Sequence, residues 1–153
     1  MLIGRYYHSL EQKSRLSIPK SFREYLGQSA FLTSGLDGCL FLYNSIEWTK
    51  LIQSATKLPI TKKAYRDWVR LLANNAIEVN FDSLGRILIP DYLVTKANLT
   101  KAVTIVGSVN HAEIWDRDNY HAYFETIENQ AEKLAESIHE PYPGLASWGH
   151  VLS

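Results

Sequence analysis

Cysteine is nearly absent from this 153-residue chain, which contains a single one, Cys39. One cysteine excludes an internal disulfide and a cysteine-based zinc site, and its apolar neighbours predict a small buried side chain. No apolar run approaches the roughly 20 residues of a membrane-spanning helix. The start, Met-Leu-Ile-Gly-Arg, lacks the basic-then-apolar order of a signal peptide. We therefore expect residence in the cytoplasm and no membrane partner.

Catalytic signatures are missing too. The five histidines show no HExxH spacing, and there is no GxSxG motif, phosphate-binding glycine loop or dinucleotide fingerprint. Asp116 and Asp118 could suggest a metal site, but aspartate is much commoner at a helix start. We therefore expect no enzymatic activity, no metal and no cofactor.

The formal net charge is zero, which by itself argues against a nucleic-acid binder. The charges are unevenly distributed, however. Residues 1–26 hold five basic and two acidic side chains, whereas residues 110–140 hold eight acidic and two basic ones. A second basic run, between Lys62 and Arg70, could bind phosphate, but such a run is more often a solvated face or pairs with an acidic neighbour, here the last helix. A neutral total can thus hide a basic face, which is what phosphates sense.

One short motif occurs twice, at an offset of 71 positions. Residues 11–19 read EQKSRLSIP, and residues 82–90 read DSLGRILIP. Each copy has an acidic residue, three spacers, an arginine and then apolar-x-Ile-Pro. Alternating residues before it and small or polar residues within it predict a β-hairpin tip, and a short helical signal follows each proline. The sequence therefore predicts two ββαββα repeats.

Capping signals place the longer helices. Asn44 or Ser45 can begin a helix that runs to about Thr56. Thr61 is the expected N-cap of a helix over residues 62–74. Asp116 or Asp118 is expected to cap one long helix that continues to roughly residue 139.

The two motifs resemble those of the MraZ family, which is built from two SpoVT/AbrB-type repeats with a DxxxR motif in each. Residues 35–41, 58–62 and 85–90 also look like family signatures. Glu11 stands where the family usually has Asp, so its pairing with Arg15 should be looser. Ser14 stands where the family usually has Gly, which questions a positive φ there.

The resemblance implies an α+β fold: a double-split or swapped-hairpin β-barrel made of two ββαββα-like repeats with outer helices. We expect four segments. These are a first SpoVT/AbrB-like repeat over 5–52, a linker and basic helix over 53–80, a second repeat over 81–124, and a C-terminal acidic helix and tail over 125–153.

The family resemblance further implies a sequence-specific DNA-binding transcriptional regulator of the division and cell-wall gene cluster, including its own gene. The expected partners are short G-rich direct repeats in double-stranded promoter DNA and further copies of the chain. These copies would form a ring-like homo-oligomer, most often an octamer. The expected location is the cytoplasm, in association with the nucleoid.

The candidate DNA-binding residues are all basic: Arg5, Lys13, Arg15 and Arg86. The candidate motif carboxylates are Glu11 and Asp82. The planar fork of arginine suits either a guanine edge or a neighbouring carboxylate, so both roles stay open for the two motif arginines. Leu84 occupies the position that matches Lys13, so we expect the first repeat to make the stronger contact and Arg86 a secondary one.

Two alternatives remain. One is an AbrB or antitoxin-type regulator of the same superfamily, although those usually carry one repeat per chain. The other is a ring-forming interaction scaffold without a nucleic-acid role. Exposure of Arg5, Lys13 and Arg15 on one surface would favour DNA binding, whereas burial of Arg15 would favour the scaffold.

Overall fold

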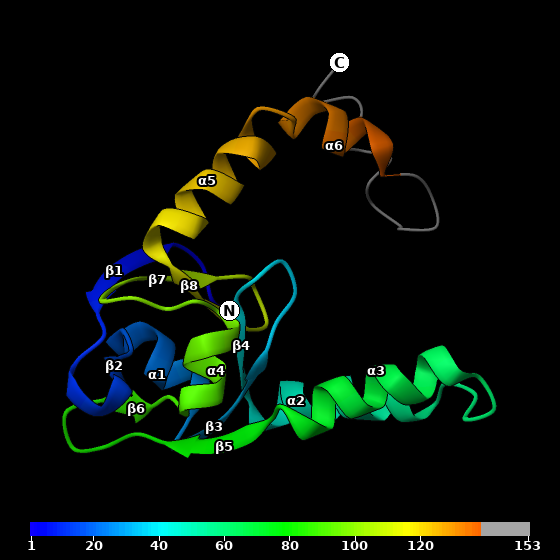
Figure 1. The fold of residues 1–153 in the computed structure, drawn as a ribbon, viewed down its shortest axis with the longest axis horizontal. Helices are drawn as coiled ribbons and strands as arrows, with labels where there is room; N and C mark the ends of the chain where they lie inside the picture. The colour runs from blue at the N-terminus through cyan, green and yellow to red at the C-terminus, as the bar shows by residue number, and fades with distance from the viewer. Residues whose placement is uncertain (139–153) are drawn as a thin grey trace. The chain divides into compact units, whose positions relative to one another are not determined.

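The computed structural model describes residues 1–138, and the tail expected up to residue 153 lies outside the described residues. The chain divides into two compact units, of which the first is Met1–Arg117 and the second starts at Asp118. The elements, drawn in Figure 1, are β1 (Arg5–Ser9), η1 (Gln12–Ser14), β2 (Arg15–Ser17), α1 (Lys20–Leu26), β3 (Ser29–Ser34), β4 (Leu40–Asn44), α2 (Ser45–Thr56), α3 (Lys63–Asn74), β5 (Ile77–Asn80), β6 (Arg86–Leu88), α4 (Asp91–Lys96), β7 (Ala102–Gly107), β8 (Ala112–Asp116), α5 (Arg117–Glu128) and α6 (Ala131–Ser137).

The strands form two antiparallel sheets in which the repeats exchange strands. The larger sheet has the order β1-β7-β8-β4-β3-β5, and the smaller one pairs β2 with β6. The strand that leads into the first motif, β1, pairs with β7 of the second repeat. The strand that leads into the second motif, β5, pairs with β3 of the first. Each repeat therefore completes its sheet with the other.

The prediction of an α+β fold is confirmed, but the swapped-hairpin β-barrel is not, because the described strands form no closed barrel. Strands β1 and β5 are the two edges of the six-stranded sheet and do not pair with each other. Beyond these edges the chain turns into β2 and β6, which are three residues long and pair only between themselves. The two motifs therefore close on each other as a separate small sheet.

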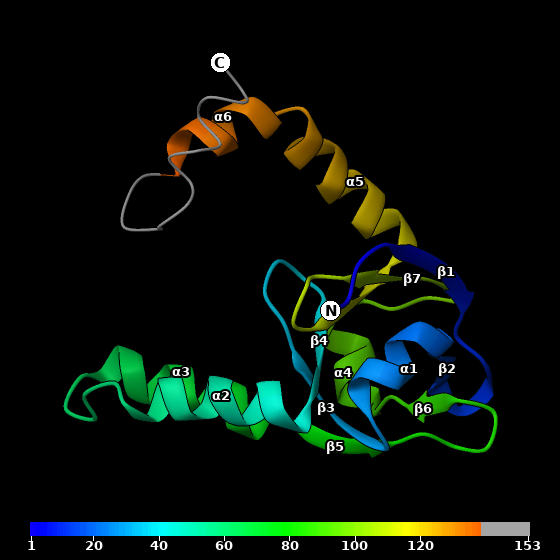
Figure 2. The same ribbon diagram turned by 180° about the vertical axis from the view of Figure 1, so that it is seen from behind.

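The core of the first unit lies between the inner face of the large sheet, the small sheet and helices α1 and α4. Leu32, Leu42 and Ile114 on the large sheet are fully buried. Leu16 and Ile87 are also fully buried and stand opposite each other across β2 and β6. Both views of the ribbon show α1 and α4 beside these strands (Figure 2). The apolar residues that follow each motif arginine therefore anchor the hairpins.

Helices α2 and α3 contact each other as an antiparallel pair. The Asn44 side chain accepts a hydrogen bond from the Glu47 N–H at 2.8 Å, which confirms one of the two predicted caps. The cap of α3 is Lys62 rather than Thr61, and it makes no side-chain capping bond. Within α3, Asp67 forms ion pairs with Lys63 and Arg70. These two basic residues are therefore paired within their own helix.

The expected single C-terminal helix is wrong: the structure has two helices, α5 and α6. The Gln130 N–H donates to the Ile127 carbonyl three residues back, at 3.0 Å, which tightens the end of α5. A new helix then starts at Ala131. The Asp116 carboxylate accepts a hydrogen bond from the Thr100 hydroxyl at 2.6 Å. Asp118 lies in the first turn of α5, where a negative charge complements the helix dipole.

Among residues 1–138 no helix is long and apolar enough to cross a membrane. The same residues contain no group of three or more His, Cys, Asp or Glu side chains that could hold a metal ion. The expected segment boundaries at residues 52, 80 and 124 stay a prediction.

Candidate nucleic-acid interface

The two motifs form hairpin turns with matching backbone hydrogen bonds. In the first, the Glu11 N–H donates to the Arg15 carbonyl at 2.8 Å. In the second, the Asp82 N–H donates to the Arg86 carbonyl at 2.9 Å. The same offset of 71 positions relates both pairs, so the repeated sequence folds into a repeated structure.

Each turn is also bonded to the strand that follows the other turn. The Ile18 N–H donates to the Gly85 carbonyl at 3.1 Å, and the Ile89 N–H donates to the Ser14 carbonyl at 2.9 Å. Gly85 has φ 77° and Ser14 has φ 55°. The departure from glycine at position 14 therefore leaves the positive φ in place, although a left-handed conformation costs an L-residue about 1–2 kcal/mol.

The four charged motif residues meet in one cluster across the repeats. Arg15 Nη1 lies 3.6 Å from Asp82 Oδ2, and Arg86 Nη1 lies 3.5 Å from Glu11 Oε1. Arg86 Nε also donates to Asp82 Oδ2 at 2.8 Å. The expected pair between Glu11 and Arg15 is replaced by these cross-repeat pairs. Two positive and two negative charges leave the cluster formally neutral.

The second turn is locked by its carboxylate. Asp82 Oδ1 accepts hydrogen bonds from the N–H groups of Leu84 and Arg86, each at 2.9 Å. The backbone bond from Arg86, followed by the bond from its side chain and the backbone bond from Leu84, lowers the pKa of Asp82. The bond with Asp82 is the main cause that raises the pKa of Arg86. Glu11, at the matching position, makes no side-chain capping bond to its own turn.

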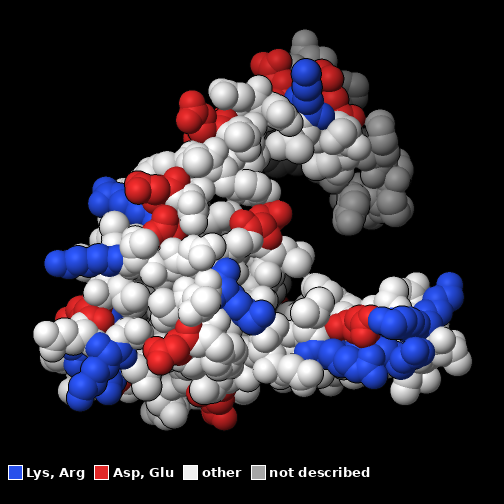
Figure 3. All heavy atoms as spheres, viewed as in Figure 1, with Lys and Arg blue, Asp and Glu red and all other residues white. Residues whose placement is uncertain are grey.

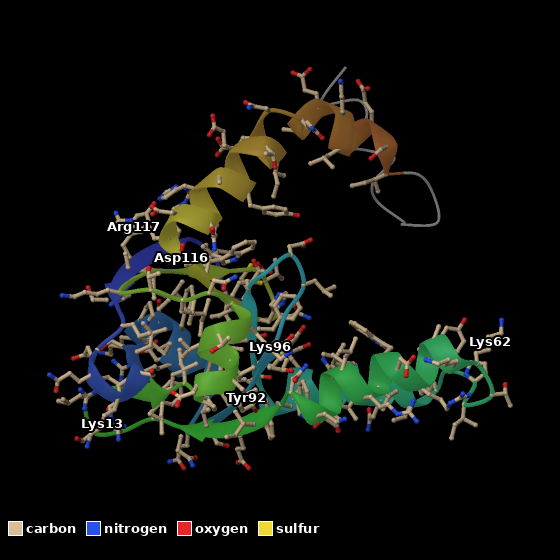
Figure 4. The ribbon with its side chains drawn as sticks, in the orientation of Figure 1. Lys13, Lys62, Tyr92, Lys96, Asp116 and Arg117 are labelled. Atoms are coloured by element: carbon tan, nitrogen blue, oxygen red, sulfur yellow. The ribbon has the colours of Figure 1, made fainter. Side chains whose placement is uncertain are left out.

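The tips of the two turns differ in charge. Lys13 is exposed at the tip of the first turn, where Figure 4 labels it. Leu84, at the matching tip position, is 69% exposed. Arg15 is neither buried nor free: 36% of its side chain is exposed while it contacts Asp82. Figure 3 shows basic side chains near η1 and β6, with acidic ones among them, and a separate basic run along α3.

Of the predicted DNA-binding residues, Arg5 is the one that lies neither in the cluster nor at the tip of a turn. It is exposed at the far end of β1, opposite Val106. Ser9, at the other end of this strand, is four positions later, a span of about 13 Å at the usual rise. Arg5 therefore belongs to a neighbouring surface rather than to the turn.

Sequence reasoning missed Arg23, which lies in α1. Its Nε donates to the Ile18 carbonyl at 3.0 Å. A Cβ added to Gly85 would lie 2.6 Å from its Cζ, so the guanidinium sits directly against the second turn. The two residues are 62 positions apart and belong to different repeats. No local pattern signals this contact.

The chain matches the sequence profile of one family twice. Residues 1–71 and residues 72–139 each match the family described as "MraZ protein, putative antitoxin-like". The two matched segments agree with the two motifs and with the two turns.

Proposed function

Because the chain belongs to the MraZ family, as its two matched repeats show, we propose that it is a sequence-specific DNA-binding transcriptional regulator. Its proposed targets are short G-rich direct repeats in promoter DNA of the division and cell-wall gene cluster, including its own gene. The proposal places it in the cytoplasm at the nucleoid and assigns it no catalytic activity, metal or cofactor.

One observation carries this proposal: the first hairpin tip presents cations to solvent. Lys13 is exposed, and Arg15 keeps about a third of its side chain accessible. The exposure of Lys13 and Arg15 favours a DNA contact over the interaction scaffold, which would bury Arg15, although Arg5 lies on a neighbouring surface. The guanidinium of Arg15 can reach the O6 and N7 acceptors of guanine bidentately. Lys13, beside it, suits a phosphate.

Assembly supplies what one copy lacks. Because the four-charge cluster is formally neutral, a single chain offers few phosphate contacts. Several linked copies bind neighbouring DNA repeats at high effective concentration and so gain affinity. We therefore propose a ring-like homo-oligomer, with an octamer as the expected form. The strand exchange between repeats supports the swapped-hairpin form of the fold, whose paired turns would face the DNA.

The test is Arg15→Ala, studied by footprinting and anisotropy on DNA from upstream of the chain's own gene. A bidentate arginine-to-base contact is worth about 1–3 kcal/mol of discrimination. With several copies engaged, specific binding should fall more than tenfold. Binding to a shuffled duplex of the same composition should change much less.

Circular dichroism and light scattering serve as controls, referred to the 17.5 kDa monomer. If the folded, assembled Arg15→Ala protein binds the upstream DNA normally, the hairpin-tip contact is wrong. If the wild type shows no preference for that DNA over the shuffled duplex, the regulator is rejected and the scaffold takes its place. A monodisperse monomer at micromolar concentration rejects the ring.

A further inference from the structure

Arg23 is held in place by a neutral partner. Its Nε donates to the Ile18 carbonyl, while the Ile18 N–H donates to the Gly85 carbonyl. A single residue just beyond β2 thus connects Arg23 to the second turn. Gly85 is buried, and a Cβ added to it would lie 2.6 Å from the Arg23 Cζ, so a larger residue would displace the guanidinium. The hydrogen bond and this close packing place the positive charge of Arg23 beside the second turn.

This charge has no counter-charge among residues 1–138. The ion pairs of the cluster join Arg15 and Arg86 to Glu11 and Asp82. Arg23 forms no ion pair in the described part of the chain, and its hydrogen bond there uses Nε alone. Its two amino groups keep their N–H donors. Beside a neutral cluster, such a group adds a full positive charge.

The two repeats distribute their cations in opposite ways. The first turn has Lys13 at its tip, where the second has Leu84. The first helix has Arg23, where the second has Val94 at the same offset of 71. The cation that the second turn lacks in its own sequence is thus supplied by helix α1 of the first repeat. Both views show α1 beside β6 (Figures 1 and 2).

We propose that Arg23 is the DNA-phosphate contact of the second hairpin turn. The proposal rests on the proposed function, because it assumes that the turns meet duplex DNA. Guanidinium groups bind phosphate oxygens through paired N–H donors. Since a phosphate carries no sequence information, Arg23 contributes affinity and register on the duplex. The second turn then takes part in binding even though Arg86 is occupied by carboxylates.

The experiment compares Arg23→Ala, Arg23→Lys and a matched control, Lys96→Ala. Lys96 is an exposed cation on α4, well separated from Lys13 in Figure 4. Binding is measured by anisotropy over a salt series, with the upstream duplex and its shuffled counterpart. Arg23→Ala should weaken binding to both duplexes by the same factor. Its salt slope should fall by about 0.9 per lost phosphate contact.

Arg23→Lys separates charge from structure. It keeps the charge but loses the fixed Nε bond, so its salt slope should stay near that of the wild type even if its melting temperature falls. Lys96→Ala should leave the slope unchanged. The proposal is overturned if the folded Arg23→Ala protein keeps the wild-type slope, or if its loss is confined to the upstream duplex. It is also overturned if Arg23→Lys loses as much slope as Arg23→Ala, because the residue would then act only through structure.

Retention on heparin distinguishes failure of this proposal from failure of the proposed function. Heparin is a polyanion and requires no operator sequence. If the wild type shows no preference for its upstream DNA, earlier elution of Arg23→Ala from heparin still supports an anion contact, and unchanged elution rejects it. If Arg15→Ala loses specific binding while Arg23→Ala keeps its salt slope, the regulator stands and the role of Arg23 is wrong.

Discussion

The two repeats have similar backbone conformations at their turns but different net charges. Residues 11–26 contain four basic and two acidic side chains, a net charge of +2, whereas the matching residues 82–97 contain two of each. Both turns nevertheless have the same hydrogen bond across the motif, and both have a positive φ at the third spacer residue. Similar geometry thus supports different surfaces.

The two turns also differ in how their charged side chains are used. The second turn is fixed by Asp82, which accepts three hydrogen bonds from its own turn. The first turn lacks such a lock but carries the exposed Lys13. Arg15 keeps part of its guanidinium accessible, while the Arg86 side chain, at 23% exposure, contacts two carboxylates. We interpret the second turn as the stronger structural support and the first as the stronger contact surface.

The largest expected effect is on stability, and it tests whether the two repeats contribute equally to the core of the small sheet. Leu16→Ala and Ile87→Ala each remove a fully buried side chain from the small sheet, and each should cost about 2–5 kcal/mol in free energy of unfolding. The double variant should be non-additive because the two side chains face each other. Urea unfolding measures all three. Leu88→Ala, at a half-exposed site, is the control; a cost below about 1 kcal/mol at either buried site contradicts the equivalence.

The next effect tests the lock of the second turn through pH. Because the folded pKa of Asp82 is lowered, its stabilisation is present above the ordinary aspartate pKa, about 3.9, and is lost as pH falls through the folded value. Asp82→Asn should therefore destabilise the protein at neutral pH. The gap between this variant and the wild type should narrow below about pH 4.

Glu11→Gln is the matched variant, and it retains Asp82. Its stability should consequently show the same acid-dependent loss from Asp82 as the wild type. Urea midpoints between about pH 3 and pH 7 decide the matter. A constant gap between Asp82→Asn and wild type over this range would show that Asp82 does not lock the turn through its charge.

A smaller effect comes from exchanging the residues at the third spacer. Gly85→Ser places an L-residue at φ 77° and drives its Cβ against Arg23, so it should cost at least about 1–2 kcal/mol. Ser14→Gly removes the strain of a positive φ at this position but increases the conformational entropy of the unfolded chain. The free energy of unfolding should therefore rise by less than about 1 kcal/mol. Thermal unfolding compares them. Equal and opposite changes would mean that the contact with Arg23 adds nothing.

The smallest effect concerns the tips. Lys13→Ala should weaken binding to all duplexes by a few-fold for each copy engaged and lower the salt slope by about 0.9 for each lost contact. Leu84→Lys adds the missing cation and should strengthen binding to all duplexes similarly. Anisotropy on upstream and shuffled DNA measures both. If Leu84→Lys has no effect while Lys13→Ala does, only the first turn approaches DNA.

Local features of the sequence predicted much of this structure. The motif repeated at an offset of 71 positions predicted the two matching turns. The Asn44 cap was also predictable, because its side chain bonds to the N–H of Glu47, only three residues later. The break at Gln130 was missed because the apolar stripe continues past it, and period alone does not show a backbone tightening. The α+β class followed from the repeats, whereas the open sheet edges depend on pairing between distant strands.

The four residues of the cluster were among the candidate residues of the sequence, but their pairing across the repeats was not predicted. Sequence distance favours a pair between Glu11 and Arg15, yet the strand exchange brings Asp82 to Arg15 instead. Likewise Arg23 reaches Gly85 only because β2 and β6 pair. Contacts of this kind are fixed by topology, so a residue's own neighbours in the chain carry no sign of them.

The exchanged strands also affect how the chain is synthesised and folds. Arg5 pairs with Val106, 101 positions later, so β1 has no partner until most of the chain has left the ribosome. At about 5–20 residues per second, this delay lasts roughly 5–20 s. Such long-range pairing also predicts slow refolding in vitro. During that interval, unpaired β1 is a site for chaperone binding or for erroneous pairing with another nascent chain.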